Sequence, residues 1–421
     1  MTVRLPGGPR RGEIRAPASK SAAQRLFLLA ALGQKPCEIA CGELSADLSA
    51  MLRCLAALGA AVTFADGRVA ITPIRSVGAG ELRLPCGESG TALRFLLPLV
   101  GALGAEAVFE REGRLPERPI APLVSELCRH GMTIASDGAL LRCSGRLRGG
   151  DWTLPGDLSS QFVSALLLAL PLLDDDSTLS VAGPLVSAPY AALTEQTLRS
   201  ASIRFSREGP RRAIPGRQRP ALPSFLSVEG DWSAAAVFLA MGALSGEGVS
   251  VSGLDPLSAQ GDRLIVELLR AFGAEVASGN DRVSVRRKEL RGLSFDASQT
   301  PDLVPVIAAL GALAEGETRI EHAARLRGKE SDRLYAAAAM LSALGADAKE
   351  LPDGLLIRGG GPLPGGAAAC FSDHRIAMAA AVAACGCDGP VTLAGAESVG
   401  KSYPSFWHDF ASLEFCDEIH R

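Results

Sequence analysis

Residues 89–104 read SGTALRFLLPLVGALG, and this stretch decides the fold because its pattern recurs along the chain. It is typical of a helix that begins at a serine and is apolar on nearly every face, as in a helix buried on all sides. Five further stretches share the pattern, and successive starts lie 70, 70, 72, 70 and 71 residues apart. The six starts are Ser19, Ser89, Ser159, Asp231, Pro301 and Ser372. Such constant spacing predicts a repeat architecture.

A second set of amphipathic helices alternates with the first. Their ends resemble Leu-x-x-Leu-Gly and fall at Gly59, Gly131, Ala201, Gly273 and Gly345, with gaps of 72, 70, 72 and 72 residues. A short run typical of a strand follows each end, and a sixth helix of this kind is expected within residues 401–413. Six repeats, each with two helices and several short strands, therefore cover the chain.

The chain is expected to divide between the third and fourth repeats. Residues 208–225 carry four prolines and little apolar periodicity, so we expect a linker there that ends near Gly230. Three repeats on each side predict two similar α/β lobes. Because the first set of helices is apolar nearly all round, we expect these helices inside each lobe, with the sheets outside them.

Composition argues against several classes of function. The formal net charge is −3, so the totals predict no nucleic-acid-binding surface. The ten cysteines form no CxxC pair, and every long apolar run is interrupted, so we expect a cytoplasmic protein with reduced thiols and no membrane span. No cluster has metal-ligand spacing, and neither GxSxG nor GxxxxGK[ST] occurs, which argues against metal, serine-hydrolase and nucleoside-triphosphate chemistry.

The helix starts instead carry polar residues of the kinds that bind anions. A helix N-terminus presents unpaired N–H groups and a partial positive charge, and Lys, Arg and Ser side chains strengthen it as a phosphate site. Taken singly, several have ordinary explanations: Ser159, Asp302 and Asp373 as caps, Lys401 as a surface lysine and His374 as a structural histidine. Eight or more such ends at equivalent repeat positions favour binding of anions in a common cleft.

These residues stand in motifs that resemble the 5-enolpyruvylshikimate-3-phosphate synthase family. The matching motifs are PASKSAAQR (17–25), CGESGTALR (86–94), RLPERPI (114–120), LSSQF (158–162), LVSAPY (185–190), GKESDRL (328–334) and SDHRIAM (372–378), with Lys401 in a matching C-terminal turn. The resemblance implies two lobes of three βαβαββ repeats each. It also implies that the N-terminal residues complete the C-terminal lobe, so we expect lobes of residues 15–229 and of 1–14 with 230–421.

The reaction that the resemblance implies moves the enolpyruvyl group of phosphoenolpyruvate to the 5-hydroxyl of shikimate 3-phosphate and releases phosphate. This is a step of the shikimate pathway toward chorismate and the aromatic amino acids. No metal or organic cofactor, nucleic acid or membrane is implied, and we expect a monomer.

The site residues follow from the same resemblance. Asp302 and Glu330 would transfer protons, and Lys20 would contact both substrates. The residues implied for phosphoenolpyruvate are Lys20, Gly90, Arg118, Gln161, Arg333, Arg375 and Lys401. Those implied for shikimate 3-phosphate are Lys20, Ser21, Arg25, Ser159, Ser160, Gln161, Ser187, Tyr190, Asp302 and Lys329. Thr91 and His374 would support the site.

Two departures and two rival functions accompany the resemblance. Ala18 stands where glycine is common, and Glu88 stands where many members have asparagine, so Glu88 would repel an anion unless a cation such as Arg118 pairs with it.

An enolpyruvyl transferase acting on UDP-N-acetylglucosamine is disfavoured by Ser21, where that family has asparagine, and by a loop at residues 112–119 without cysteine. A catalytically silent phosphometabolite-binding homologue is disfavoured because Lys20, Asp302 and Glu330 are all retained.

Overall fold

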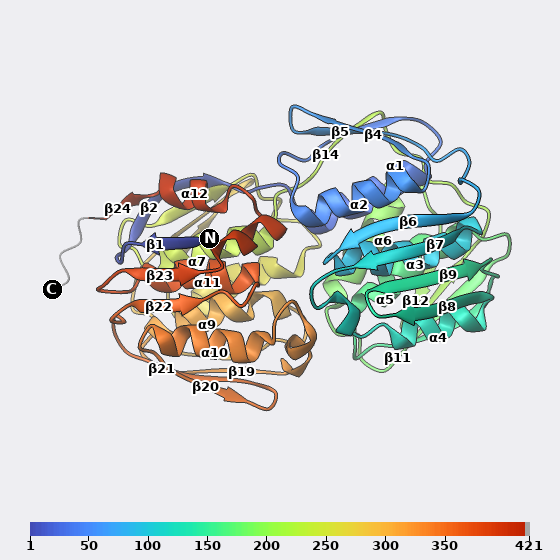
Figure 1. The fold of residues 1–421 in the computed structure, drawn as a ribbon. Helices are drawn as coiled ribbons and strands as arrows, with labels where there is room; N and C mark the ends of the chain where they lie inside the picture. The colour runs from blue at the N-terminus through green and yellow to red at the C-terminus, as the bar shows by residue number, and fades with distance from the viewer. Residues whose placement is uncertain (417–421) are drawn as a thin grey trace. The chain divides into compact units, whose positions relative to one another are not determined.

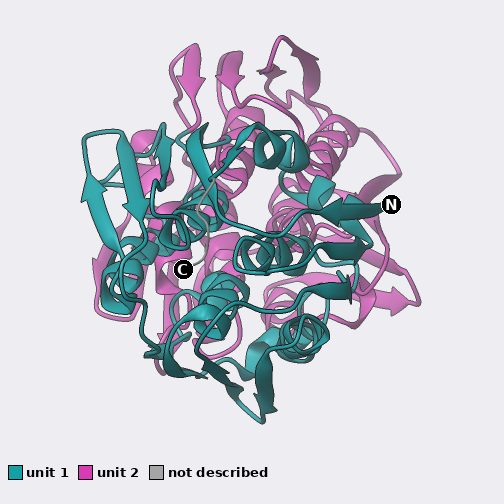
Figure 2. Cartoon of the chain, turned by 90° about the vertical axis from the view of Figure 1, so that its left-hand side faces the viewer, with its two compact units in different colours: residues 1–17, 229–421 teal, residues 18–228 magenta. Residues whose placement is uncertain are grey.

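The computed structural model describes residues 1–416 of the 421, and the chain forms two compact units. Unit 1 contains Met1–Pro17 and Glu229–Arg421, and unit 2 contains Ala18–Val228 (Figure 2). Residues 417–421 of the expected C-terminal lobe lie outside the described residues. The chain passes from one unit to the other after Pro17 and again after Val228.

Each unit is built around three helices that are buried along nearly their whole length (Figure 1). These inner helices are α1 (Lys20–Leu32), α3 (Gly90–Leu103) and α5 (Ser160–Ala169) in unit 2, and α7 (Trp232–Ala243), α9 (Val304–Leu313) and α11 (His374–Ala384) in unit 1. Five of them begin at a residue whose side chain accepts a hydrogen bond from a first-turn N–H. The capping residues are Ser19, Ser89, Ser159, Asp231 and Asp373. The prediction of buried helices is therefore confirmed at all six positions and that of a capping residue at five, whereas α9 follows the 3₁₀ turn Pro301–Leu303 and begins at Val304.

A second helix in each repeat buries a smaller share of its residues. These helices are α2 (Ala46–Ala57), α4 (Ala121–Arg129), α6 (Ala188–Ser200), α8 (Ile265–Phe272), α10 (Arg333–Ala343) and α12 (Phe406–Ser412). Glycines with positive φ follow four of them, at Gly59, Gly131, Gly273 and Gly345. Glycine suits this left-handed position because it has no Cβ.

Unit 2 contains three four-stranded sheets with the same pairing. In each sheet two parallel strands lie side by side, and a hairpin pairs antiparallel with the second of them. The strand orders are β14 (Phe225–Ser227), β3 (Cys37–Ala40), β5 (Arg68–Thr72), β4 (Ala61–Ala65); β6 (Glu81–Gly87), β7 (Glu106–Arg111), β9 (Leu140–Gly145), β8 (Met132–Asp137); and β10 (Gly150–Pro155), β11 (Ser177–Ala182), β13 (Arg211–Ile214), β12 (Ser206–Glu208).

Unit 1 repeats this pairing in two of its sheets, and the third has three strands. The strand orders are β18 (Ser294–Asp296), β19 (Gly316–Glu321), β21 (Gly354–Gly359), β20 (Asp347–Leu351); β16 (Glu275–Ser278), β17 (Arg282–Arg286), β15 (Val249–Ser252), β2 (Arg10–Arg15), β24 (Glu414–Phe415); and β1 (Thr2–Leu5), β23 (Val391–Ala394), β22 (Gly366–Ala369). The N-terminal strands β1 and β2 thus complete two sheets of unit 1.

The proline-rich stretch 208–225 is not a free linker, so that part of the sequence prediction is wrong. Strand β13 lies within it and pairs with β11, and Arg212 is buried, with its Nε donating to Glu195 at 3.0 Å. Prolines lack an N–H, yet the residues between them still form backbone hydrogen bonds to unit 2. The N–H of Gln218, for example, donates to the carbonyl of Pro171 at 2.8 Å.

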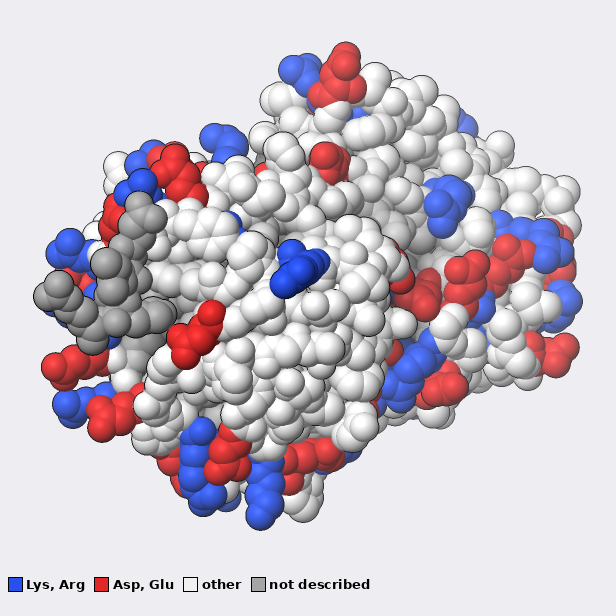
Figure 3. Space-filling view, turned by 60° about the vertical axis from the view of Figure 1, so that its left-hand side comes forward, with Lys and Arg blue, Asp and Glu red and all other residues white. Residues whose placement is uncertain are grey.

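Two further findings concern the helices and the charged side chains of the described residues. No helix among them is both long enough and apolar enough to cross a membrane. On the face drawn in Figure 3, acidic and basic side chains are interspersed. Four of the cationic residues that the sequence singles out are instead buried, namely Arg25 within α1, Arg118 before α4, Arg333 at the start of α10, and Lys401.

Candidate functional site

Arg333 is the centre of a buried cluster in unit 1. It is the first residue of α10, and its side chain is 2% exposed. Its Nε donates to Asp373 at 2.8 Å, its Nη1 to Asp302 at 2.8 Å and its Nη2 to Glu330 at 2.7 Å. One guanidinium group therefore holds three carboxylates, which we call the Arg333 cluster.

Arg375 adds a second cation to this cluster. Its Nη2 lies 3.2 Å from Asp302 Oδ2, and its backbone N–H donates to Asp373 at 2.9 Å. Asp302 belongs to the 3₁₀ turn η4 (Pro301–Leu303), which precedes α9, and Asp373 caps α11. The helix starts of the fifth and sixth repeats thus meet at Asp302 through two arginines.

The three carboxylates of the Arg333 cluster keep Arg333 positively charged. Burial alone would lower the pKa of Arg333, but the charges of Asp373, Glu330 and Asp302 raise it above its ordinary value. Arg333 therefore stays charged, and it compensates carboxylates that burial would otherwise penalise. Asp302 and Glu330 are each 13% exposed, so these two carboxylates are partly accessible to solvent.

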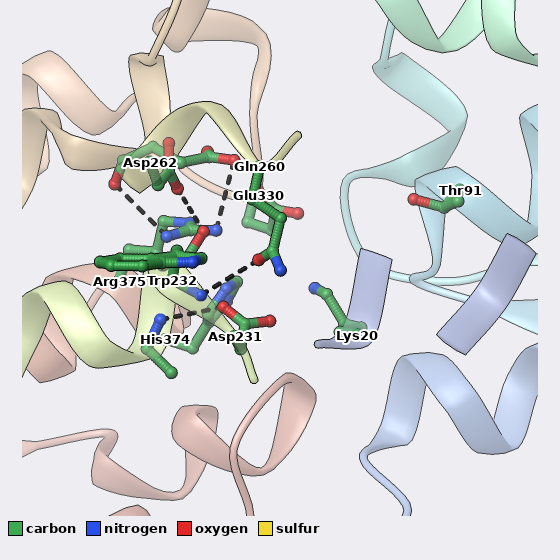
Figure 4. A network of polar contacts seen from close by, with 12 residues as sticks. Lys20, Thr91, Asp231, Trp232, Gln260, Asp262, Glu330, His374 and Arg375 are labelled. Carbon is green, nitrogen blue, oxygen red and sulfur yellow. Dashed lines mark hydrogen bonds and ion pairs between the residues drawn. The ribbon is translucent and has the colours of Figure 1, made fainter. Parts of the chain in front are cut away.

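The remaining predicted residues of unit 1 lie on neighbouring turns. Lys329 follows the 3₁₀ turn η5 (Ala324–Gly328) and directly precedes Glu330. Lys401 ends the 3₁₀ turn η6 (Ala396–Lys401) and is largely buried. His374 is the first residue of α11, and its Nδ1 lies 3.7 Å from Asp373 Oδ1, so the structure places it against the cluster (Figure 4).

Lys20 is the cation at the start of α1 in unit 2. Its Nζ lies 2.9 Å from Asp47 Oδ2, and Asp47 lies in the first turn of α2. Gln24 Nε2 lies 3.4 Å from both the Asp47 carbonyl and Ser89 Oγ. These contacts join the starts of α1, α2 and α3.

Arg25 joins the starts of α1 and α6. Its Nη1 donates to the Ser21 carbonyl at 2.7 Å, its Nη2 to the Tyr190 carbonyl at 3.0 Å and its Nε to Thr194 Oγ1 at 2.8 Å. Burial lowers the pKa of Arg25 to about 10, which still leaves it charged at neutral pH. Arg25 thus fixes the backbone next to Ser21 and Tyr190, and Ser187 occupies the N-cap position of α6 in a left-handed backbone conformation, φ 50°.

Gly90 leaves room for two guanidinium groups at the start of α3. A Cβ on Gly90 would lie 2.7 Å from Arg94 Nη1 and 2.8 Å from Arg118 Nη1. Arg94 Nη1 donates to Gln161 Oε1 at 2.8 Å, and Gln161 Nε2 donates to Thr91 Oγ1 at 3.0 Å.

The neighbouring start of α5 carries two serines. Ser159 caps this helix, and Ser160 is its first residue and is buried. The starts of α3 and α5 together place two arginines, a glutamine and three hydroxyl groups near each other.

The polar residues of unit 1 and those of unit 2 suit two different chemical tasks. Unit 1 holds two partly accessible carboxylates beside arginines, which is an arrangement for proton transfer next to an anion. Unit 2 offers cations, hydroxyl groups and helix starts, which suit phosphate and sugar-like hydroxyls. Among residues 1–416 no group of three or more His, Cys, Asp or Glu side chains could hold a metal ion.

Comparison with known proteins identifies the family of this chain. A family profile described as EPSP synthase (3-phosphoshikimate 1-carboxyvinyltransferase) matches residues 6–410. The chain belongs to the EPSP synthase family. A 3-phosphoshikimate 1-carboxyvinyltransferase from Clostridium kluyveri is 38% identical over 96% of this chain and 95% of its own length. One from Methanothrix thermoacetophila is 41% identical over 96% of each chain.

Solved structures support the fold. EPSP synthase from Acinetobacter baumannii is 24% identical, with a TM-score of 0.80 over 99% of each chain. The enolpyruvyl transferase NikO from Streptomyces tendae is 20% identical, with a TM-score of 0.78 over 98% of each chain. The predicted fold of two lobes with βαβαββ repeats is therefore confirmed as that of the enolpyruvyl transferases.

Sequence reasoning missed three charged residues near these helix starts. Asp47 contacts Lys20, Arg94 lies beside Gly90, and Asp262 lies near Asp302 and Arg375. A signal existed for Arg94, because residues four apart on a helix share a face, and Arg94 follows Gly90 by four. A signal also existed for the two aspartates, since they precede Gly59 and Gly273 by 12 and 11 residues in equivalent repeats.

Proposed function

We propose that the chain transfers the enolpyruvyl group of phosphoenolpyruvate to the 5-hydroxyl of shikimate 3-phosphate and releases inorganic phosphate. Family membership supports this reaction, and the Arg333 cluster supports it chemically. The observation that carries the proposal is that one buried guanidinium holds Asp302 and Glu330 while both carboxylates stay partly accessible.

The reaction needs three proton transfers. A proton must reach the methylene carbon of phosphoenolpyruvate, and the 5-hydroxyl must lose its proton as its oxygen bonds to the adjacent carbon. The intermediate then loses a proton from its new methyl group, and the C–O bond to phosphate breaks. We propose that Asp302 and Glu330 carry these protons, with Lys20 as the third titratable group.

Cations must hold the two anionic substrates. We propose that Arg118, Arg375 and Lys401, with the backbone at Gly90, bind phosphoenolpyruvate, and that Gln161 contacts both substrates. We propose that Arg333 also binds phosphoenolpyruvate through its Nη1, which donates to Asp302, because its Nη2 already donates to Glu330 at 2.7 Å and to Asp373 at 3.4 Å. Arginine suits this double task because its donors lie in one plane.

The helix starts of unit 2 would hold shikimate 3-phosphate. We propose that Ser159, Ser160 and Ser187 bind its phosphate and that Ser21, Arg25 and Tyr190 position the ring. Lys329 and Asp302 of unit 1 complete the proposed set.

The proposed context is that of a biosynthetic enzyme. We propose a cytoplasmic monomer of the shikimate pathway that works with its two small-molecule substrates and no cofactor. Light scattering after size-exclusion chromatography tests the monomer, which has an expected mass of 43.6 kDa. A constant mass of twice this value at micromolar protein would contradict it.

The proposed function is tested by comparing two acceptors of the enolpyruvyl group. Phosphate release from phosphoenolpyruvate is measured with shikimate 3-phosphate and separately with UDP-N-acetylglucosamine, and the product is identified by mass spectrometry. We expect turnover with shikimate 3-phosphate alone. Glu330→Gln should lower this turnover about 10²- to 10⁴-fold, whereas Glu289→Gln makes the same change at a side chain that is 89% exposed and should not. Release with UDP-N-acetylglucosamine only, or with neither acceptor, would refute the proposal.

A further inference from the structure

Asp262 is a buried carboxylate that the proposed chemistry does not use. It lies in the 3₁₀ turn η3 (Gly261–Leu264), which leads into α8, and it is 2% exposed. Its Oδ2 accepts a hydrogen bond from Ser233 Oγ, whereas no donor among residues 1–416 reaches its Oδ1. A buried oxygen without a donor costs free energy, so a role in folding alone does not explain this carboxylate.

The neighbours of Asp262 connect it to the Arg333 cluster. The charged groups that act on it are Asp302 from η4, Arg375 from α11 and Asp231 from the cap of α7. Figure 4 shows Asp262 and Arg375 on adjacent parts of one polar network in unit 1. Arg375 pairs with Asp302 at 3.2 Å, so the guanidinium that pairs with Asp302 is also the cation that acts electrostatically on Asp262.

The charge of Asp262 is poised to change near neutral pH. Burial and then the charge of Asp302 raise the pKa of Asp262 to about 7, against the opposing effects of Arg375 and the Ser233 hydroxyl, while Asp231 raises it further. Below this pH the carboxyl is neutral, and above it a second negative charge faces Arg375.

We propose that Asp262 is a positioning residue whose charge sets how strongly Arg375 attracts phosphoenolpyruvate. With Asp262 neutral, Arg375 is balanced by Asp302 alone and attracts the anionic substrate more strongly. With Asp262 ionised, two carboxylates compete with the substrate for Arg375. The inference rests on the proposed function, because it assigns phosphoenolpyruvate to Arg375.

The coupling between protonation of Asp262 and binding of phosphoenolpyruvate has a size that can be measured. A proton on Asp262 and an anion at Arg375 favour each other by the same factor, because coupling between two bound ligands is reciprocal. Coupling of this kind is on the order of five- to tenfold in affinity at the low end of its usual range. The KM for phosphoenolpyruvate should therefore rise by roughly that factor as Asp262 loses its proton.

The decisive variant is Asp262→Asn, which keeps the shape of the side chain and removes its charge at every pH. The KM for phosphoenolpyruvate is measured from pH 5.5 to 9 at saturating shikimate 3-phosphate. The ratio of the wild-type KM to the variant KM should be near one at low pH and should rise about five- to tenfold through pH 7. Taking a ratio cancels the ionisation of phosphoenolpyruvate itself.

Two further variants separate charge from structure. Ser233→Ala removes a hydrogen bond that favours the ionised form of Asp262, so the rise in KM should move to higher pH. Glu267→Gln removes one charge from α8 at a side chain that is 66% exposed, and its profile should follow the wild type. If Asp262→Asn does not fold, Ser233→Ala alone decides the test. The inference is then overturned if the pH dependence of the KM for phosphoenolpyruvate is the same in Ser233→Ala as in the wild type.

The outcomes distinguish the inference from the proposed function. Normal turnover with a KM ratio that is flat in pH overturns the role of Asp262 and leaves the reaction standing. A ratio shifted equally at every pH indicates a structural effect and also overturns it. A wild-type protein without turnover at any pH refutes the proposed function, and the inference falls with it.

Discussion

Replacing Gly90 by alanine tests how the start of α3 handles anions. The added Cβ would lie 2.7 Å from Arg94 Nη1 and 2.8 Å from Arg118 Nη1, whereas ordinary contacts begin at 3.4 Å. The two guanidinium groups must therefore move by about 0.6 to 0.7 Å. Gly90 is the first residue of a helix and has no positive φ, so the backbone itself accepts alanine.

The expected magnitudes separate binding from stability. Alanine in a helix gains about 0.5–1 kcal/mol over glycine. Strain on the Arg94 hydrogen bonds to Gln161 and Pro119 costs a similar amount, about 0.5–1.5 kcal/mol, so the melting temperature should change little. Losing one charge-assisted hydrogen bond to phosphoenolpyruvate costs about 1.5–3 kcal/mol, and its KM should rise roughly 10- to 150-fold.

The assay measures both Michaelis constants and the melting temperature on one preparation. Gly90→Ala should raise the KM for phosphoenolpyruvate and leave that for shikimate 3-phosphate within about twofold, since less than about 0.5 kcal/mol is involved. Gly101→Ala is the control on the same helix, because its Cβ would overlap Met132 and Leu147 in the core and should lower stability without selecting a substrate. A Gly90→Ala protein that melts early and loses affinity for both substrates alike would refute the reasoning.

Three further predictions concern other residues. Glu330→Gln and Asp302→Asn should each lower turnover about 10²- to 10⁴-fold with a much smaller change in KM, and near-normal turnover in steady-state assays would remove them from the chemistry. Arg333→Met removes the cation that pairs with the buried Asp373 and with the partly accessible Asp302 and Glu330, and should lower the free energy of unfolding by about 3–5 kcal/mol, as measured by urea titration; an unchanged midpoint would contradict this. Among the ten cysteines, all within residues 1–416, Cys128 alone is exposed, and burial raises the pKa of others such as Cys86 to about 12. Iodoacetamide at pH 8 should therefore modify Cys128 first by mass spectrometry, and equal labelling of the rest in the folded protein would contradict the structure.

The inner helices of the fold could be predicted because each is encoded locally. A capping residue followed by an apolar stretch specifies both the start and the burial of a helix, as at Ser19, Ser89 and Asp231. The pairing of β14 with β3 could not be predicted in this way, because it joins residues nearly 190 positions apart. The strands at 206–214 were missed for a related reason, since prolines and arginines mask their short apolar alternation.

The candidate site was only partly accessible to sequence reasoning. The motifs single out Asp302, Glu330 and Arg333 as candidates. Because Asp302 lies 31 residues before Arg333, the sequence does not reveal that one guanidinium holds both carboxylates. Asp47 and Asp262 read as ordinary residues of a first helical turn. Their neighbours Lys20 and Arg375 come from other elements, so tertiary packing alone reveals the contacts.

The measurement that tests the central claim most directly is turnover in D₂O with phosphoenolpyruvate and shikimate 3-phosphate. If Asp302 and Glu330 protonate and later deprotonate the methylene carbon, solvent deuterium must appear in the vinyl group of the product. Mass spectrometry should then show a product heavier by deuterium, and Glu330→Gln and Asp302→Asn should form this product far more slowly. A product that forms at the normal rate without deuterium would contradict the account.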